Sequence, residues 1–191
     1  MSILQKFKNS ALELSSVQTL CICSMMLALR IVLGMFTNFT LAIVPFVKIG
    51  LSFIPVVLTA MLYGPVCAAV VSGAGDVLSI ILSNPTAFSI MPGITLCCVI
   101  EGIIYGIVLY KDDVTLKDII IAKALVLVLC SLPLNTLVLS LVMNMPYFTL
   151  LMYRTLVLVP FAVVEVFISY FMNKAVKRID KKYLGKNKRL S

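Results

Sequence analysis

Long apolar runs, separated by short polar or proline-containing breaks, limit the folds open to this sequence. Hydrophobic residues make up 61% of the 191 residues and charged residues 13%, and the mean hydropathy is +1.11. A soluble domain is about 45–50% apolar and about 25% charged, so this chain cannot cover its surface with polar groups in water. A helix crosses a bilayer with roughly 20 apolar residues, which leaves room for about six crossings. The composition therefore excludes a soluble globular protein and a disordered chain.

The runs and their breaks predict an all-α integral membrane protein with six transmembrane helices. Gly64-Pro65, Asn84-Pro85 and Asn144-Met145-Pro146 mark turns between runs. The six predicted helices are Val17–Phe36, Lys48–Tyr63, Val66–Ser83, Met91–Tyr110, Ile119–Met143 and Leu150–Asn173. We expect a single membrane domain over residues 1–191, with short tails at about residues 1–16 and 174–191. The first tail is amphipathic and has no cleavable signal pattern.

The basic residues predict that both termini are cytoplasmic. Sixteen Lys and Arg residues stand against eight Asp and Glu, which gives a net charge of +8, and eight of the sixteen lie between Lys174 and Arg189. With the N-terminus inside, thirteen of the sixteen fall in inner segments or at inner helix ends, as the positive-inside rule requires. A basic tail also suits nucleic acid, but the adjoining apolar sequence favours the membrane interpretation.

The three exceptions to this rule are candidate binding residues. Arg30 lies in the outer half of the first predicted helix, and Lys48 and Arg154 open the second and sixth helices from outside. A cation well inside a span costs roughly 2.5–3.5 kcal/mol even on insertion scales. Three of them at one end of separate helices suggest one shared anionic ligand. For Lys48 and Arg154, snorkelling to lipid headgroups is the alternative.

Uncharged polar and acidic residues add to the candidate site. Ser72, Asp76 and Ser79 fall at i, i+4 and i+7 on one face of the third helix, and Asn135 lies on the fifth. The serine and aspartate face indicates either a pocket wall or hydrogen bonding between helices. Carboxylates buried in the spans are usually paired, so Asp76, Glu101 and Glu165 are candidate partners of a buried cation. The carboxylates therefore have a structural as well as a functional interpretation.

Aromatic residues gather at the same outer end and suit the stacking of a flat heteroaromatic ligand. They are Phe36, Phe39, Phe46, Phe88, Tyr147, Phe148 and Tyr153. An interfacial aromatic belt explains some of them equally well. The apolar connection Thr37–Val47 is predicted to fold over the site as a lid together with Ser83–Met91, which places Phe88 among the candidate ligand contacts.

Several chemistries are excluded by what the sequence lacks. There is no His, and the six cysteines form no CxxC pair, so neither a metal site nor a redox cofactor is expected. Gly73-Ala74-Gly75-Asp76 spells the GxGD of aspartyl intramembrane proteases, but no second Asp lies in any predicted helix. No GxxxxGK[ST] motif exists to bind ATP. Uphill transport would therefore draw on a partner or an ion gradient.

The first helix carries a candidate docking surface. Ser24 and Ala28 are small residues four positions apart, on a face about 140° away from Arg30. Small residues at this spacing let two membrane helices approach closely. The partner is either another protein or a helix of the same chain, and Gly102 and Gly106 favour the second interpretation for their own helix.

The stretch Ile49-Gly-Leu-Ser-Phe-Ile-Pro55, followed by Met61-Leu-Tyr-Gly-Pro65, resembles the second helix and turn of S components of energy-coupling factor (ECF) transporters, particularly the folate type. Further pieces extend the resemblance over most of the chain. They are Leu29-Arg-Ile-Val-Leu33, Gly73–Asp76, Pro92-Gly-Ile-Thr-Leu96, Gly102-Ile-Ile-Tyr-Gly106, Asn135-Thr136, Leu150-Leu-x-x-Arg154 and Pro160.

The resemblance implies six helices in a bacterial cell membrane and a vitamin site near the extracellular face. It also implies partnership with a transmembrane coupling protein and two cytoplasmic ATPases. Members carry an Ala-x-x-x-Ala contact for the coupling protein on the first helix, where this chain has Ser24 and Ala28. Folate-type members use an arginine of that helix near the vitamin, and Arg30 is the matching position.

These observations favour a non-enzymatic substrate-binding subunit for folate, whose pterin ring and two carboxylates suit the outer rings and cations. An S component for another anionic vitamin such as pantothenate is the nearest alternative. A stand-alone secondary transporter would use Asp76 or Glu101 as its ion site. A membrane enzyme ranks third, because no nucleophile has a credible base.

Overall fold

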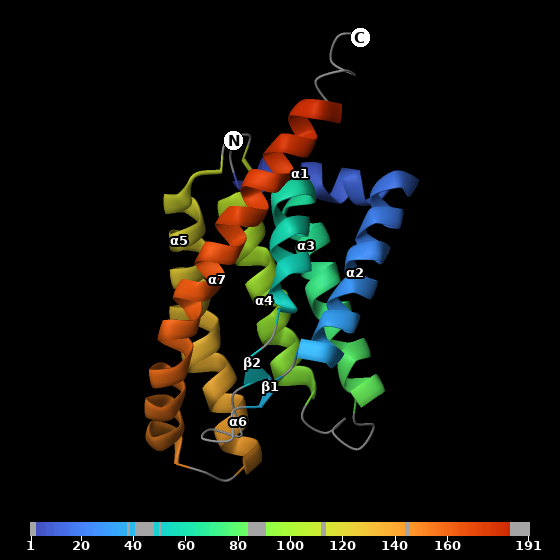
Figure 1. Cartoon of the computed structure of the whole chain (residues 1–191). Helices are drawn as coiled ribbons and strands as arrows, with labels where there is room; N and C mark the ends of the chain where they lie inside the picture. The colour runs from blue at the N-terminus through green and yellow to red at the C-terminus, as the bar shows by residue number, and fades with distance from the viewer. Residues whose placement is uncertain are drawn as a thin grey trace.

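The computed structural model describes residues 3–37, 39–40, 48–49, 51–83, 91–111, 114–143 and 146–183. The elements in chain order are α1 (Ile3–Leu14), α2 (Val17–Thr37), β1 (Phe39–Thr40), β2 (Lys48–Ile49), α3 (Phe53–Ser83), α4 (Met91–Leu109), α5 (Leu116–Val126), the π-helix η2 (Leu127–Leu134), α6 (Asn135–Met143) and α7 (Tyr147–Tyr183). Strands β1 and β2 form one antiparallel pair, with Phe39 opposite Ile49. Apart from this pair the described elements are helices, so the predicted helical membrane fold is confirmed (Figure 1).

Gly64 divides α3 into two helices. Its φ of 82° and ψ of −165° are not helical, and Pro65 begins the second helix with the fixed φ that suits a first turn. Five helices of the described residues are long and apolar enough to cross a membrane, and α3 counts once among them. Divided at Gly64, α3 supplies two of the six predicted membrane segments. The predicted Gly64-Pro65 turn lies beside α1, because Ser10 of α1 forms hydrogen bonds with Tyr63 and Val66 on either side of it.

Several boundaries differ from the sequence-based prediction. The second predicted helix begins at Phe53 rather than Lys48, because Lys48 and Ile49 pair with β1. The predicted N-terminal tail contains α1, and α7 continues past Asn173 to Tyr183. The fifth predicted helix is α5, η2 and α6 in succession, and Pro133 lies inside the π-helical turn. Proline has no N–H for the regular helical bond, which accounts for a local change of helix type there.

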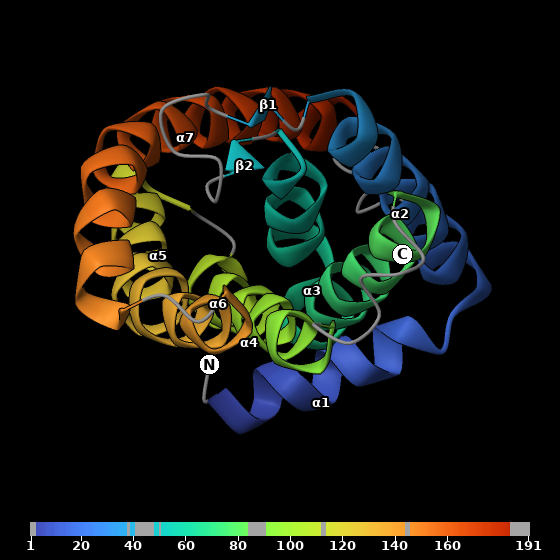
Figure 2. The ribbon, with the colours of Figure 1, turned by 90° about the horizontal axis from the view of Figure 1, so that it is seen from below.

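The first part of α3 is the centre of the bundle. In an 18-residue apolar window of α3, 67% of the residues are buried, against 11–28% in the corresponding windows of the other four spans. Figure 2 shows this part inside the ring formed by the other helices. Val56, Ala60 and Met61 pack there against Tyr105 and Leu109 of α4. A helix that is apolar on every face is expected at such a position, which explains the nearly uninterrupted apolar sequence of this segment.

The two ends of the bundle differ in their architecture. One end carries α1, the Gly64 turn and the end of α7, and we call it the terminal end (Figure 1). The other carries β1 and β2, and we call it the hairpin end. The first described helix, α1, and the C-terminal end of α7 thus lie at the same end of the bundle. The predicted cytoplasmic location of the termini stays a prediction.

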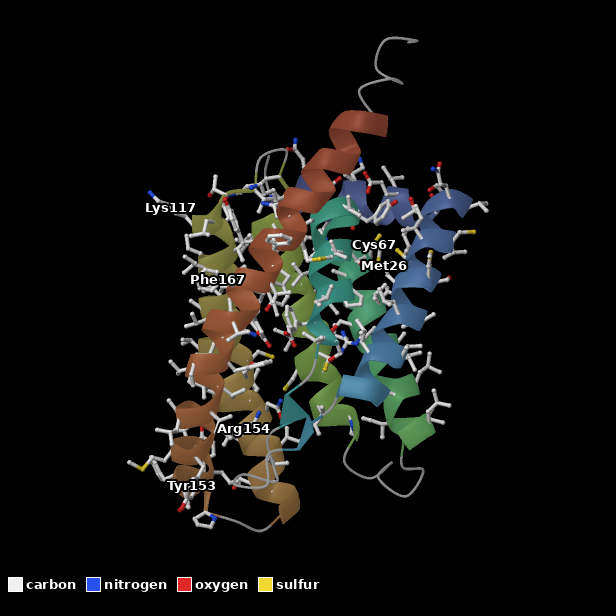
Figure 3. All side chains as sticks on the ribbon, in the orientation of Figure 1. Met26, Cys67, Lys117, Tyr153, Arg154 and Phe167 are labelled. Atoms are coloured by element: carbon white, nitrogen blue, oxygen red, sulfur yellow. The ribbon has the colours of Figure 1, made fainter. Side chains whose placement is uncertain are left out.

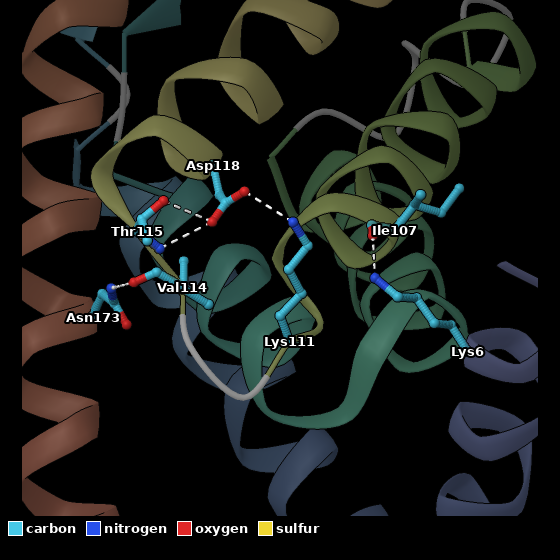
Figure 4. A network of polar contacts seen from close by, with 7 residues as sticks. All are labelled: Lys6, Ile107, Lys111, Val114, Thr115, Asp118 and Asn173. Atoms are coloured by element: carbon cyan, nitrogen blue, oxygen red, sulfur yellow. Dashed lines mark hydrogen bonds and ion pairs between the residues drawn. The ribbon is translucent and has the colours of Figure 1, made fainter. Parts of the chain in front are cut away.

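Hydrogen bonds attach α1 to the terminal end. Lys6 is 6% exposed, and its Nζ donates to the carbonyl oxygen of Ile107 at 2.7 Å (Figure 4). Burial lowers the pKa of the Lys6 ammonium, and the charge of nearby Lys111 lowers it further while Asp118 opposes the shift. Ser10 is fully buried, donates through Oγ to the carbonyl oxygen of Tyr63 at 2.6 Å, and accepts from the N–H of Val66 at 3.1 Å. A serine of α1 therefore caps the helix that follows Gly64.

The same network joins α4, α5 and α7. Lys111 pairs with Asp118 at 2.9 Å, and Asp118 accepts from the N–H and the hydroxyl of Thr115 (Figure 4). Asn173 of α7 donates through Nδ2 to the carbonyl oxygen of Val114 at 3.0 Å. Each of these polar groups has its partner within the chain, so together they hold the helices of the terminal end in place.

Candidate functional site

Arg30 lies against the second part of α3. Its guanidinium donates to Ser72 Oγ at 2.9 Å, and that hydroxyl donates to the carbonyl oxygen of Cys98 on α4 at 2.7 Å. The arginine side chain covers Gly75 so closely that a Cβ there would collide with it. The glycine of the sequence motif therefore makes room for the arginine. Arg30 faces the bundle, as predicted, and a single hydrogen bond to Ser72 uses one of its five donors.

Asp76 extends this cluster toward α4. It is half-buried, and its Oδ2 accepts from the hydroxyl of Thr95 at 2.9 Å. Ser79 is also half-buried on the same helix. We define Arg30, Ser72, Asp76 and Thr95 as the outer polar cluster. Thr95 was not predicted, because a lone threonine in an apolar helix carries no signal of its own.

Arg154 enters the bundle from the opposite side, on α7. The residue is 6% exposed, and its Nε is buried without a hydrogen-bond partner in the part of the chain that the structure describes. Figure 3 shows it on the inner side of α7, whereas the neighbouring Tyr153 points away from the bundle. Burial of this depth argues against snorkelling to lipid headgroups. A buried guanidinium donor without an acceptor is costly and marks a place for an anionic or carbonyl oxygen.

The structure describes only part of the other predicted ligand contacts, which are Asn135, Lys48 and Phe88. Asn135 is half-buried at the junction of η2 and α6, and its backbone N–H donates to the carbonyl oxygen of Cys130. Lys48 pairs through its backbone in β2, but its side chain lies outside the described residues. Phe88 lies entirely outside them, as does most of the predicted lid. Their roles stay predictions.

Two of the predicted aromatic contacts face away from the site. Phe148 is 81% exposed and Tyr153 is 56% exposed on the outside of α7. Tyr147 and Phe148 contact each other edge to face, with ring centroids 5.8 Å apart. At this end of a membrane helix, exposed rings are typical of an interfacial belt. These side chains therefore support the belt interpretation rather than ligand stacking.

Lys123 and Glu165 form an ion pair inside the membrane region. The pair joins α5 to α7, and the two side chains are only 13% and 10% exposed. The positive-inside count groups Lys123 with the inner cations, and the structure shows that its side chain pairs with Glu165 within the span. Glu165 was expected to pair with a buried cation, and Lys123 is that cation. The available signal was the depth of Lys123 within its apolar run, where a charge needs a partner.

The small residues fall into two groups. Ser24 and Ala28 are exposed on α2, and the Ser24 hydroxyl donates to the carbonyl oxygen of Leu20 in its own helix. Internal packing is thus excluded for this pair within the described structure. Gly102 and Gly106 do pack internally, because a Cβ at either position would collide with the backbone of α3. The exposed pair keeps its interpretation as a docking surface.

The arrangement can bind an anion but offers no evident route to covalent chemistry. Two arginines reach the bundle interior from α2 and α7, and Arg154 retains an unused buried donor. No group of three or more metal-ligating side chains occurs within the described ranges. Four cysteines are buried and all six are free. A polar ligand with acceptor oxygens is the chemistry that these donors fit.

Residues 18–176 match the protein family described as "ECF transporter, substrate-specific component". A folate transporter FolT from Clostridium novyi (strain NT) is 32% identical over 123 residues, which cover 64% of this chain and 69% of that protein. A folate transporter FolT from Leuconostoc mesenteroides is 26% identical over 170 residues, covering 83% of this chain and 87% of that protein.

The fold of this chain is also similar to a solved structure. The crystal structure of FolT bound with folic acid is similar to this fold with a TM-score of 0.75 at 29% sequence identity. The similarity covers 83% of this chain and 95% of the crystallised chain.

Proposed function

The chain belongs to the family of ECF transporter substrate-specific components, and on this premise we propose that it binds folate or a related pterin. It takes up the vitamin at the extracellular side and delivers it through partner subunits. The FolT proteins among its relatives support the choice of vitamin. The family and the membrane-spanning helices establish a multi-pass membrane protein, and the cell membrane of a bacterium is its proposed location.

The observation that carries the proposal is the unpartnered buried donor of Arg154. Folate has two carboxylates at one end and a polar heteroaromatic ring at the other, so it can satisfy cations on two sides of a bundle. Arg154 and Arg30 stand on α7 and α2, with the second arginine held by Ser72. A bound carboxylate supplies the charge-assisted hydrogen bond that the protein leaves unmade.

Titration calorimetry with folic acid tests the vitamin, with pantothenate as competitor. We expect folic acid to bind and pantothenate not to displace it. Arg30→Ala should weaken folate binding by about 30- to several-thousand-fold, because loss of one partner of a buried charged contact typically costs 2–5 kcal/mol. Binding of pantothenate instead of folate would favour the alternative vitamin, and an unchanged affinity in the variant would remove Arg30 from the site.

The delivery step is proposed to use a coupling protein and two ATPases, with Ser24 and Ala28 as the docking surface. Both residues are exposed on α2, whereas Arg30 on the same helix faces inward to Ser72. Ala28→Trp should therefore keep folate affinity but lose uptake in cells that supply the partners. Leu137→Trp, at an exposed position of α6, is the matched control and should keep both.

Two results would contradict this assignment. Full uptake by Ala28→Trp would place the docking surface elsewhere. Uptake into vesicles that lack ATP and partners would indicate a self-sufficient secondary transporter.

The hairpin end is proposed to face outside and the terminal end the cytoplasm. The support is the concentration of basic residues at the terminal end, where Lys6, Lys8, Lys111 and Lys117 lie. Labelling of Lys8→Cys by a membrane-impermeant maleimide, in a chain with Cys21→Ala, tests the orientation. Label should enter only after the cells are broken, and labelling of intact cells would reverse the orientation.

A further inference from the structure

An apolar groove lies on the outside of the bundle between α5 and α7. Its volume is about 380 Å³, and none of the proposed folate contacts lines it. Among its lining residues are Leu116, Ile120 and Ala124 of α5 and Val163, Val166 and Phe167 of α7. The groove lies within two membrane-spanning helices, so hydrocarbon rather than water is the medium that reaches it.

Cations stand at the terminal end of the groove on both of its walls. Lys117 precedes Ala124 by seven residues, and Lys174 follows Phe167 by seven. Seven residues return a helix to within about 20° of the same direction and advance it by about 10 Å. Both lysines are therefore aligned with the groove and displaced toward the terminal end. Figure 3 shows Lys117 just beyond Phe167 at that edge of the molecule.

The two lysines differ from the other cations near the groove. Lys123, which lines the groove, forms an ion pair with Glu165, and Lys111 forms one with Asp118. Lys117 and Lys174 are exposed, and neither forms an ion pair within the ranges that the structure describes. The groove thus combines an apolar slot in the hydrocarbon region with two uncompensated positive charges at one end.

We propose that this groove binds an anionic phospholipid. One acyl chain lies along Ala124 and Val163, and the phosphate lies between Lys117 and Lys174. A lipid has this distribution of chemistry, with a long apolar part and one charge at the interface. A transmembrane helix of a partner is the competing occupant, but it would need no pair of cations confined to one end of the groove. The site is independent of the vitamin site.

Native mass spectrometry of the purified chain, titrated with dioleoyl phosphatidylglycerol or dioleoyl phosphatidylcholine, tests the proposal. Each juxtamembrane lysine is worth about fivefold in affinity for an anionic surface, so the anionic lipid should bind roughly 25-fold more tightly. Lys117→Gln with Lys174→Gln should abolish most of that preference. Lys8→Gln removes an exposed lysine of α1 at the same end and should preserve it.

The groove itself is tested by filling it. Ala162→Phe and, from the opposite wall, Ala124→Phe should weaken the binding of both lipids while folate binding confirms that each variant is folded. Val70→Phe, at a 48% exposed position of α3, is the control and should change nothing. Equal affinity of the unmodified chain for the two lipids would overturn the proposal. Lipid binding that is unchanged in both filling variants would also overturn it. If the filling variants no longer bound the coupling protein, the occupant of the groove would be a helix of that partner.

Discussion

The terminal end and the hairpin half both bury a cation, but Lys6 at the terminal end has a hydrogen-bond partner, whereas Arg154 Nε in the hairpin half has none in the described chain. Glu13 Oε2 of α1 also lacks a partner there, but Oε1 of the same carboxylate accepts from the hydroxyl of Tyr110. At the terminal end, Lys6, Ser10 and Asn173 are at most 6% exposed, and each donates to a backbone carbonyl oxygen of another segment of the chain. In the hairpin half, Arg154 Nε and Thr136 Oγ1 are buried without a partner in the described chain. A partnered buried group stabilises the fold, whereas an unpartnered one indicates a ligand.

This difference separates residues that hold the bundle together from residues that are proposed to bind folate. Substitutions of the first kind should lower stability and leave affinity unchanged in the folded protein. Substitutions of the second kind should lower affinity without lowering stability. The Lys123–Glu165 pair belongs to the first kind, since its charges compensate each other.

The largest effect is expected for Lys123→Met. Removal of one partner of a buried ion pair typically costs 3–5 kcal/mol, because the remaining charge is left uncompensated. The free energy of unfolding in detergent should fall by about that amount, while the folded fraction keeps its folate affinity. Lys123→Met with Glu165→Leu is the control and should recover most of the loss, since an apolar pair of similar volume replaces the ions. If Lys123→Met had the same free energy of unfolding as the parent, the ion pair would not stabilise the bundle.

Arg154→Met, unlike Lys123→Met, should lower folate affinity without lowering stability. Folate affinity should fall by about 30- to several-thousand-fold. The thermal midpoint without ligand should not fall and is expected to rise, because a buried donor without a partner is removed. Calorimetry and thermal unfolding of the same sample check the two halves of this prediction. A loss of stability with unchanged affinity would move Arg154 to the structural group.

A smaller effect is expected at the turn of the terminal end. Gly64 adopts a backbone conformation that is essentially restricted to glycine, and its neighbours Ser10 and Tyr110 approach within 3.2 Å of where a Cβ would lie. Gly64→Ala should cost about 1–3 kcal/mol of stability. Its effect on folate affinity should be negligible, because the turn lies at the end remote from the arginines. A stable variant with weakened binding would show that the two ends are coupled.

Ser10→Ala should have the smallest effect. The hydroxyl caps the helix that starts at Pro65, and loss of a capping side chain costs about 1 kcal/mol. Hydrogen exchange at the amides of Val66 and Cys67 should increase, because they lose their acceptor. Ser15→Ala, whose hydroxyl bonds only to Leu12 of its own segment, is the control. Unchanged exchange at both amides would exclude the cap.

The sequence predicted what depends on hydrophobicity and local chain chemistry. Six apolar segments, the Gly64-Pro65 turn and the inward direction of Arg30 all follow from composition, turn residues and helical spacing. The docking of α1 did not, because Lys6 and Ser10 find their partners on Ile107 and Tyr63, far away in the chain. A carbonyl oxygen carries no side-chain signature, so tertiary bonds to it are invisible in the sequence.

The same limit applies within the candidate site. The spacing of Ser72 and Asp76 placed them on one face, but it did not reveal that Ser72 receives Arg30 or that Thr95 meets Asp76. The pairing of Lys123 with Glu165 depends on how α7 lies against α5, which no local pattern encodes. The sequence thus singled out Arg30 and Asp76 as candidates and left their hydrogen-bond partners open.

Hydrogen–deuterium exchange of the purified chain, with and without folic acid, tests the difference between the two ends most directly. Folate should protect peptides that carry Ser72, Asp76, Thr95 and Arg154, within residues 70–83, 91–100 and 147–156. Peptides of the terminal end, within residues 3–16 and 107–118, should exchange at the same rate in both states. Protection centred on the terminal end, or spread evenly over the bundle, would contradict the account.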